Sequence, residues 1–371
     1  MTSSHADRRD LRLDLCRGLA LCFIFLDHVP DNALGWLTLR NYGFSDTTEV
    51  FFFVSGYTCM IAYGMALRER GWLATVARAL QRGWEIYVAF LLLLLAYLAL
   101  VQVLGATKEY LDETNTGVFF ANPGKAAIHA LLMQYMPVNT DVLPTFVLLH
   151  AGFPAVLWLL NRVPSLTLVG SLALYLTAHL LDWNLRAWPQ GEWYFNPLAW
   201  QFLFVFGAWY AAVGSIRLET VLRSKTAMAL AGLYLMFAFV VAMSWQFHAL
   251  ETMFPEQLVK LIYPIDKSSL SPLRLFHFIA LAVVVSRLLQ HDWRGLMTPG
   301  MRAMIRCGEN SLPIYCLSVP LALVAHIALK QISDGLAMQL AVSLAGIAIM
   351  VATATVLTWV AKLDRHGPKL F

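Results

Sequence analysis

Ionisable side chains surround a very short apolar stretch near the start of the chain. In RLDLCRGLALCFIFLDHVP, residues 12–30, the charged positions flank an uncharged run of only nine residues. Arg17 and His28 are close to three α-helical turns apart, so they share one helix face about 16 Å apart along the axis. Ionisable groups at membrane depth are costly and mark a site or pathway. The alternatives are an i,i+3 pair of Asp14 with Arg17, and a His28 that only ends the helix.

Two carboxylates lie at the start of a second apolar segment, FSDTTEVFFFVSGY, residues 44–57. Asp46 and Glu49 are three residues apart and are therefore neighbours on one helix face. A carboxylate hydrogen-bonded to an imidazole raises its basicity and fixes its tautomer, as a general base requires, so either residue can orient His28. Gly56 within the aromatic run permits close approach of another helix.

Cationic residues recur at two further helix starts. In SPLRLFHF, residues 271–278, Arg274 and His277 share one face, and Arg274 is suited either to bidentate binding of a carboxylate or to snorkelling at the interface. In RCGENSLPIYC, Asn310 or Ser311 can cap a helix whose free N–H groups would bind an anion, although capping alone accounts equally well for Asn310.

Aromatic residues crowd the segment DWNLRAWPQGEWYFNPLAW, residues 182–200, and Asn196-Pro197 is a favourable helix start. The segment is typical of an interfacial aromatic belt, and its ring faces are also suited to stacking on a sugar. If this sugar is the acceptor of a transfer reaction, we predict that it is bound by polar and aromatic side chains of the segment: Trp193, Tyr194, Asn196, Trp200 and Gln201.

The elements that must position these residues are membrane helices. The chain has 371 residues, of which 59% are hydrophobic and 13% charged, with a mean hydropathy of +0.61; soluble domains carry about 25% charged residues. We predict an all-α, polytopic integral membrane protein that is a single transmembrane domain over residues 1–371. Apolar runs predict ten spans, near 13–36, 48–67, 79–104, 143–160, 165–182, 197–214, 226–246, 274–290, 311–330 and 336–361.

The distribution of basic residues predicts the orientation of these spans. With the N-terminus in the cytoplasm, most of the 27 Lys and Arg fall on the cytoplasmic side, so we expect both termini there. The longest outer connection, residues 105–142, contains AAIHALLMQYM (126–136), which is suited to an interfacial helix that roofs a cavity. Basic groups then lie at the cytoplasmic mouth, and the carboxylate and histidine residues lie toward the outer face.

Composition argues against several other functions. The five cysteines form no CxxC motif and suit core packing. The ten histidines are scattered, so we expect no metal site. The basic residues are distributed by topology rather than gathered in one patch, so we expect no nucleic-acid partner. No permanently bound cofactor is expected, the lipid bilayer is an expected partner, and the oligomeric state stays open.

Five stretches taken in order resemble the OpgC family, whose members are linked to succinylation of osmoregulated periplasmic glucans: RLDLCRGLALCFIFLDHVPDN, FSDTTEVFFFVSGY, EWYFNPLAWQFLF, SPLRLFHF and GENSLPIYC. The Arg-x10-His element and the FFFVSGY run also resemble the wider acyltransferase-3 superfamily. This resemblance implies a multi-pass protein of the bacterial inner membrane, an acyl-CoA donor in the cytoplasm, with succinyl-CoA as co-substrate, and a periplasmic glucan acceptor. It implies His28 as the catalytic histidine with Asp27 beside it, and Arg17 as the motif arginine.

A mechanism follows as a hypothesis. Phosphate groups require fixed cations or helix N-termini, so the CoA moiety is expected at the inner basic residues. His28 removes the proton from a glucosyl hydroxyl, which attacks the thioester directly, while Arg274 holds the far carboxylate of the succinyl group. An acyl-enzyme intermediate is the competing chemistry. The candidate donor-binding residues are Arg12, Arg17, Arg78, Arg82, Arg274, His277, Arg306, Asn310 and Ser311.

Three alternatives remain open at this point. The enzyme can transfer acetyl or another acyl group to a periplasmic glycan. A proton-coupled transporter or flippase also places charges at membrane depth, although the chain has no paired repeats or matching broken helices. A non-catalytic scaffold for glucan synthesis is the third.

Overall fold

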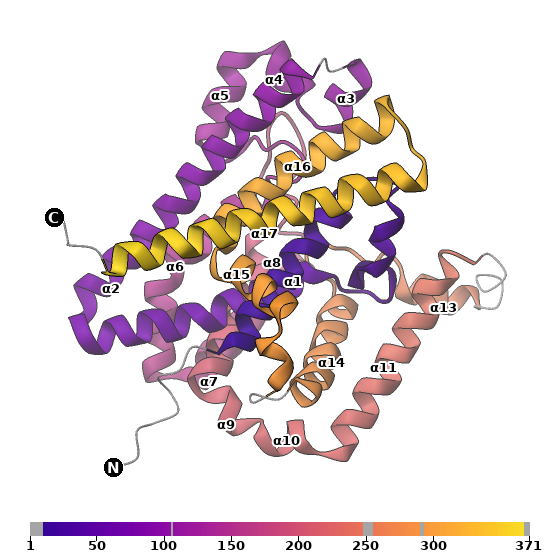
Figure 1. The fold of residues 1–371 in the computed structure, drawn as a ribbon. Coiled ribbons are helices and arrows are strands. Elements are labelled where there is room, and N and C mark those ends of the chain that lie inside the picture. Colours follow the sequence, from indigo (N-terminus) through magenta and orange to yellow (C-terminus); the bar gives the residue numbers. More distant parts are fainter. Residues whose placement is uncertain (1–9, 105–106, 248–254, 290–292, 367–371) are drawn as a thin grey trace. The chain divides into compact units, whose positions relative to one another are not determined.

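The computed structural model describes residues 10–104, 107–247, 255–289 and 293–366. These residues are helical, with one isolated β-bridge between Arg186 and Glu192 and no strand among them (Figure 1). The all-α prediction is confirmed. The chain ends, which we predict to be cytoplasmic, fall in residues 1–9 and 367–371 and lie outside the described residues. Two compact units divide the chain: Met1–Leu39 with Ala282–Phe371, and Arg40–Leu281.

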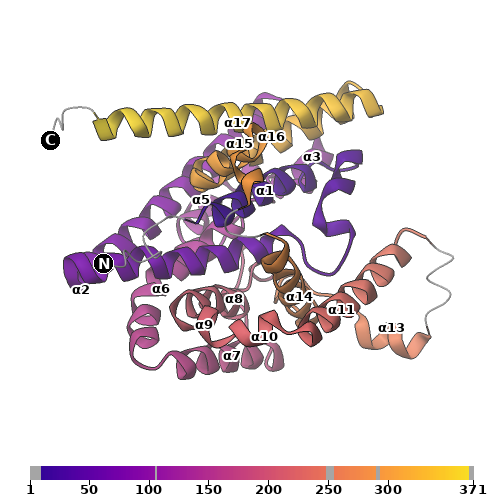
Figure 2. The ribbon, with the colours of Figure 1, turned by 60° about the horizontal axis from the view of Figure 1, so that its bottom comes forward.

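The first unit is built on the crossing of α1 (Leu11–Asp27) and α15 (Pro299–Glu309). Asp10 caps α1 by accepting a hydrogen bond from the backbone N–H of Arg12. A Cβ atom at Gly18 would overlap a backbone carbonyl of α15, and one at Gly308 would overlap a backbone carbonyl of α1, so the two helices touch through bare backbone. α16 (Ser311–Gln331) and α17 (Leu336–His366) run side by side and also contact this pair (Figure 2).

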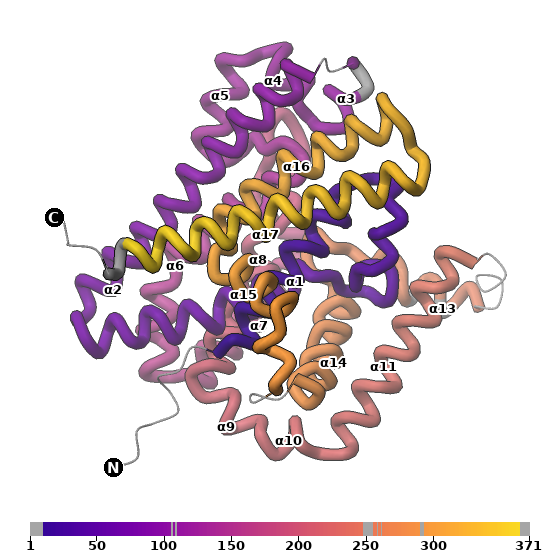
Figure 3. The backbone as a smooth tube through the Cα atoms, in the orientation of Figure 1, coloured from indigo at the N-terminus to yellow at the C-terminus, as the bar shows by residue number. Residues whose placement is uncertain are grey.

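The second unit is organised by α2 (Thr47–Val103), which covers both predicted spans 48–67 and 79–104. The helix breaks at Gly71, whose φ of 81° is a conformation that favours glycine, and the chain bends there (Figure 3). Its first half crosses α8 (Pro197–Trp209) at Gly56, where a Cβ would overlap the backbone carbonyl of an α8 residue. The prediction of close helix approach at Gly56 is confirmed.

Further helices of the second unit pack on this pair. α6 (Val142–Arg162) lies against α2, and α7 (Pro164–Leu180) lies against α8. The chain passes from the second unit into the first along α14 (Pro272–Leu288). The first unit also contains the short helices η2 (Ala33–Leu37) and η5 (Arg294–Met297). The remaining elements are η3 (Leu39–Asn41), α3 (Lys108–Glu113), α4 (Gly117–Ala121), α5 (Pro123–Leu131), η4 (Tyr210–Gly214), α9 (Ser215–Arg217), α10 (Glu219–Arg223), α11 (Lys225–Ser244) and α13 (Glu256–Ile262).

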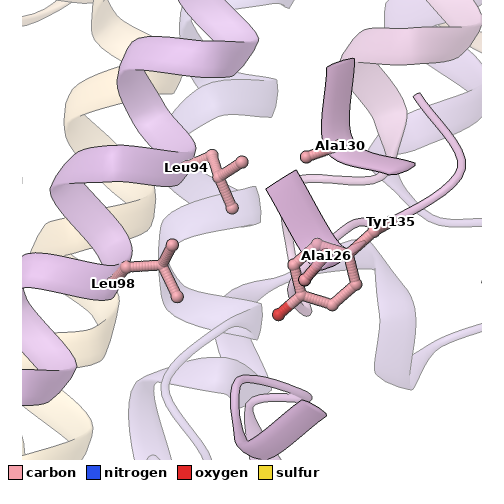
Figure 4. Close-up of a cluster of buried hydrophobic side chains, with 5 residues drawn as sticks. All are labelled: Leu94, Leu98, Ala126, Ala130 and Tyr135. Atoms are coloured by element: carbon pink, nitrogen blue, oxygen red, sulfur yellow. The ribbon is translucent and has the colours of Figure 1, made fainter. Parts of the chain in front are cut away.

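The predicted interfacial helix within 126–136 corresponds to α5. Its small residues Ala126 and Ala130 are buried against Leu94 and Leu98 of α2, together with Tyr135 (Figure 4). Spacing of four residues places each pair on one helix face, so α5 packs on the second half of α2 along an apolar stripe. Its role as the roof of a cavity stays a prediction.

Six of the described helices are long and apolar enough to cross a membrane. The helices α1, α7 and α14 have 17 residues each and span about 26 Å, a little less than a hydrocarbon core of about 30 Å. The chain is therefore a multi-pass membrane protein, while the count of ten spans and the orientation of the termini stay predictions. The six are Thr47–Val103, Val142–Arg162, Pro197–Arg217, Lys225–Ser244, Ser311–Gln331 and Leu336–Leu363.

Candidate functional site

A capping box fixes two predicted site residues at the N-terminus of α2. The side chain of Asp46 accepts a hydrogen bond from the backbone N–H of Thr48 at 2.8 Å, and Glu49 Oε2 accepts one from the backbone N–H of Asp46 at 3.0 Å. The pattern of an acid followed three residues later by Glu satisfies two otherwise unpaired N–H groups of the first turn. Both carboxylates are buried, Glu49 completely.

Two cations from a distant part of the chain neutralise these carboxylates. Arg274 of α14 donates from Nε to Glu49 Oε1 at 2.7 Å and from Nη2 to Asp46 Oδ2 at 3.1 Å. Lys267 Nζ donates to the same Asp46 Oδ2 at 2.7 Å. We call these four residues, Asp46, Glu49, Lys267 and Arg274, the ion network. It pairs two acids with two bases, so that no formal charge of the buried cluster is left without a partner.

The electrostatics of Asp46 follow from this pairing. Burial by itself favours the neutral carboxylic acid, but the charges of Lys267 and Arg274 outweigh it and hold the pKa of Asp46 well below its usual range. The same pairing acts in reverse on Lys267, where burial favours the neutral amine and the Asp46 carboxylate raises the pKa above its ordinary value. Both groups therefore stay charged near neutral pH.

The predicted catalytic pair Asp27 and His28 belongs to the other unit. His28 is half-buried and ends α1, where its backbone N–H donates to carbonyls of the last turn. Asp27 Oδ1 accepts a hydrogen bond from Thr38 Oγ1 at 2.7 Å. The oxygens of Asp46 and Glu49 accept hydrogen bonds from donors of their own unit, and their orientation of His28 stays a prediction.

His277 contacts a serine that the sequence analysis did not single out. Its Nδ1 lies 2.6 Å from Ser45 Oγ and also accepts a hydrogen bond from the Ser45 backbone N–H at 3.3 Å. Because the backbone N–H can only donate, Nδ1 is unprotonated in this arrangement. Both side chains are buried, so His277 anchors the segment before α2 next to the ion network. Its predicted donor-binding role stays a prediction.

The predicted acceptor-binding residues divide into exposed and buried ones. Tyr194 is 46% exposed, whereas Trp193, Asn196 and Trp200 are buried. Asn196 caps α8 through the backbone N–H of Leu198. The amide of Gln201 is paired with Ser171, whose Oγ donates to Gln201 Oε1 at 2.6 Å.

The buried members of this group hold the loop that carries Lys267. The indole N–H of Trp200 donates to the carbonyls of Lys267 and Ser268, at 3.2 and 3.0 Å, and the backbone N–H of Asn196 donates to the Ser268 carbonyl at 3.0 Å. Asp266 closes the turn by accepting the backbone N–H of Ser268 at 2.9 Å. In this arrangement the ring of Trp200 is enclosed in the protein. Among the three aromatic residues predicted to bind the acceptor, Trp193, Tyr194 and Trp200, Tyr194 has the exposed ring.

Lys267 is the residue of the ion network that the sequence analysis missed. The signal was present in the short polar segment DKSSLSP before the α14 motif, but no local pattern indicates that this lysine pairs with Asp46, 221 positions earlier. Asp141, the residue directly before α6, was missed as well. It is half-buried, and burial raises its pKa to about 6 although nearby backbone N–H groups and Lys267 act in the opposite direction.

The predicted donor-binding arginines are distributed over both units. In the first unit, Arg17 adjoins the crossing at Gly18, and Arg12 pairs with Asp10 at 2.7 Å and donates to the Leu289 carbonyl at 3.1 Å. In the second unit Arg78 is exposed, and Arg82 pairs with Glu85 at 2.8 Å. Arg78 and Arg82 are therefore in a different unit from the other two.

The junction of α15 and α16 is tied to α17 by side-chain hydrogen bonds. Arg306 Nη1 donates to Thr355 Oγ1 at 3.0 Å, and Asn310 Nδ2 donates to Thr358 Oγ1 at 2.9 Å. Ser311 begins α16, and the side chain of Asn310 makes no cap hydrogen bond there, because its amide is oriented by the bonds that Nδ2 donates to the Arg306 carbonyl and to Thr358. The expected capping by Asn310 is wrong for this reason, and anion binding at this helix end stays a prediction.

Within the described ranges, no group of three His, Cys, Asp or Glu residues is arranged to hold a metal ion. The five cysteines are free thiols.

Long apolar helices and a buried ion network at a helix start define a polytopic membrane protein with an ionisable site at the end of a span. A family model described as OpgC protein matches residues 9–362, nearly the whole chain. The chain belongs to the OpgC family, and this membership indicates an acyltransferase. Comparison with curated proteins and with solved structures gives no match.

Proposed function

We propose that this protein transfers a succinyl group from cytoplasmic succinyl-CoA to hydroxyl groups of osmoregulated periplasmic glucans, at the bacterial inner membrane. The family match over residues 9–362 carries this proposal. The long apolar helices support it, because a donor and an acceptor in different compartments require a catalyst that crosses the bilayer.

His28 acts as the general base in this proposal. Its imidazole takes the proton of a glucosyl hydroxyl while the hydroxyl oxygen attacks the thioester carbonyl. The carbon–sulfur bond then breaks, the ester forms, and the proton passes from the imidazolium to the departing CoA thiolate. Asp27 precedes His28 at the end of α1 and is held by Thr38, which supports a role in orienting the imidazole.

The acyl-CoA is bound by the cationic residues of α1 and α15 in this proposal. Arg17 and Arg306 lie on two helices that are in direct contact, and a pyrophosphate needs several fixed donors. Arg274 is a weaker candidate for holding the succinyl carboxylate than its position on α14 suggested, because its Nε and Nη2 atoms already donate to Glu49 and Asp46.

The test is acyl transfer by the purified protein in lipid nanodiscs, with radiolabelled succinyl-CoA and the unsubstituted periplasmic glucan fraction from cells that lack the protein. We expect labelled glucan from the wild type, and a loss of about 10²–10⁴-fold in His28→Ala, the usual contribution of general base catalysis. His179→Ala is the matched control, because His179 also lies at a helix end and its Nδ1 is bonded to a backbone carbonyl at 3.0 Å.

Three results would contradict the proposal. Near-normal transfer by a folded His28→Ala variant removes His28 from the mechanism. Faster labelling with acetyl-CoA than with succinyl-CoA assigns a different acyl group. A protein that consumes no acyl-CoA but moves glucan or acyl groups across proteoliposomes would be a transporter.

A further inference from the structure

Four residues of the second unit, Asp141, Tyr194, Phe195 and Lys267, form a cluster that is partly exposed to solvent and that shares Lys267 with the ion network. Lys267 Nζ lies 5.7 Å from the ring centroid of Phe195, and 29% of the Lys267 side chain is exposed. Tyr194 meets Phe195 edge to face at 5.0 Å and is 46% exposed. Asp141 directly precedes α6, four residues before Thr145, whose side chain bonds to the Phe195 carbonyl, so Asp141 lies at the end of α6 that contacts the aromatic segment.

Hydrogen bonds between distant segments hold this cluster in place. Thr145 in the first turn of α6 donates from Oγ1 to the carbonyl of Phe195 at 2.9 Å, which fixes the start of α6 against the aromatic segment. Trp200 fixes the carbonyl of Lys267 in the same way. Because these contacts are buried, the exposed groups project from a rigid base, as a binding site requires.

The donors and acceptors of the cluster are only partly used. Among the described residues, the ammonium of Lys267 makes one hydrogen bond, to Asp46 Oδ2, and a lysine has three N–H donors. The phenol of Tyr194 can donate and accept, and an ionised Asp141 carboxylate accepts at two oxygens. The cluster therefore presents donors, acceptors and an aromatic ring face on one surface.

The charge balance indicates which ligand fits. The formal charges of the ion network cancel, and an ionised Asp141 adds a negative charge, which opposes the binding of an acyl carboxylate or a phosphate. A neutral sugar suits it better, since its hydroxyls can donate to Asp141 and accept from Lys267 while its apolar face covers an aromatic ring.

We propose that Asp141, Lys267 and Tyr194 form the subsite that binds a glucose unit of the acceptor, with Asp141 accepting a hydrogen bond from a sugar hydroxyl and Lys267 donating one. This inference rests on the proposed function for the identity of the sugar. It assigns the acceptor rather than the donor to this end of α2 and α6, and it gives Trp200 and Asn196 the role of positioning Lys267.

Two measurements test the subsite: direct binding of the unsubstituted glucan fraction to protein in nanodiscs, and steady-state kinetics with the glucan and succinyl-CoA varied in turn. We expect Asp141→Asn to raise both the Kd and the KM for glucan by about tenfold or more, since it replaces a hydrogen bond to a charged acceptor by a weaker one to a neutral amide. The KM for succinyl-CoA should change less than about twofold. Asp182→Asn is the matched control, since Asp182 is exposed beyond α7 and has a φ of 49° that Asn tolerates.

Tyr194→Ala provides a second variant that leaves every charge of the ion network in place, and it too should weaken glucan binding without affecting the donor. The subsite is overturned if Asp141→Asn and Tyr194→Ala bind glucan as the wild type does, if their effect falls on the KM for succinyl-CoA, or if the wild type binds no glucan. Glucan binding that depends on Asp141 in a protein that transfers no succinyl group would retain the subsite and refute the proposed reaction.

Discussion

Removal of Arg274 is the sharpest test of the ion network. Arg274→Met keeps an unbranched side chain of similar length but leaves the completely buried Glu49 without its cation, while Asp46 retains Lys267. Breaking a buried pair by removing one partner costs about 3–5 kcal/mol, because an uncompensated charge remains in a medium of low dielectric constant. We expect a loss of this size in the free energy of unfolding.

A double-mutant cycle separates this effect from a simple loss of packing. Glu49→Gln combined with Arg274→Met removes both charges, so the double variant should lose less stability than the sum of the two single variants, with a coupling energy of about 2 kcal/mol or more. The matched control is Arg223→Met in the exposed pair of Arg223 with Glu219, whose loss should cost less than about 1 kcal/mol.

The free energies are measured by detergent-induced unfolding of the purified protein in mixed micelles, with tryptophan fluorescence as the signal. An Arg274→Met variant that is no less stable than Arg223→Met would refute the inference that this network is a desolvated structural unit. So would strict additivity in the cycle, because two groups joined at 2.7 Å in a buried site must couple.

Three further predictions follow from the packing and charges described above. Gly18→Ala should separate α1 from α15 and cost roughly 1–3 kcal/mol of stability in the same unfolding assay. The control is Gly232→Ala on α11, which should not be destabilising because the added Cβ meets open space. Equal effects of the two substitutions would contradict the close contact of α1 with α15. The KM for glucan should fall as the pH rises through about 6, because Asp141 ionises there. Tyr194 and Lys267 keep their protons in this range, since burial raises the pKa of Tyr194 and the carboxylate of Asp46 raises the pKa of Lys267. A pH dependence of the KM that persists in Asp141→Asn would refute this assignment. Trp200→Phe should lower the free energy of unfolding by about 1–3 kcal/mol and raise the KM for glucan, since the carbonyls of Lys267 and Ser268 each lose one of two hydrogen bonds. An unchanged KM would contradict the positioning role.

Local features of the chain were predictable because they depend on residues a few positions apart. The apolar runs predicted the helices, and the helix period predicted that Asp46 and Glu49 are neighbours, which the capping box confirms. The break in α2 was anticipated as two separate spans, although the sequence pattern did not identify Gly71 as the point where one continuous helix bends.

The pairing of charges required the tertiary structure. Lys267 is 221 positions from Asp46 and Arg274 is 225 positions from Glu49, and no periodicity relates them. The same holds for Trp200, whose sequence context suits an exposed sugar platform or a buried packing residue equally, and whose burial is decided by the loop that covers it.

The sequence by itself determined the family, the helical membrane class and the residues that share a helix face, because these follow from composition, motif order and the 3.6-residue period. Only the tertiary structure decided which cation neutralises which carboxylate and which aromatic ring stays exposed. Those outcomes depend on how helices distant along the chain pack, and packing between helices is fixed by shape and desolvation over many residues together rather than by any short stretch.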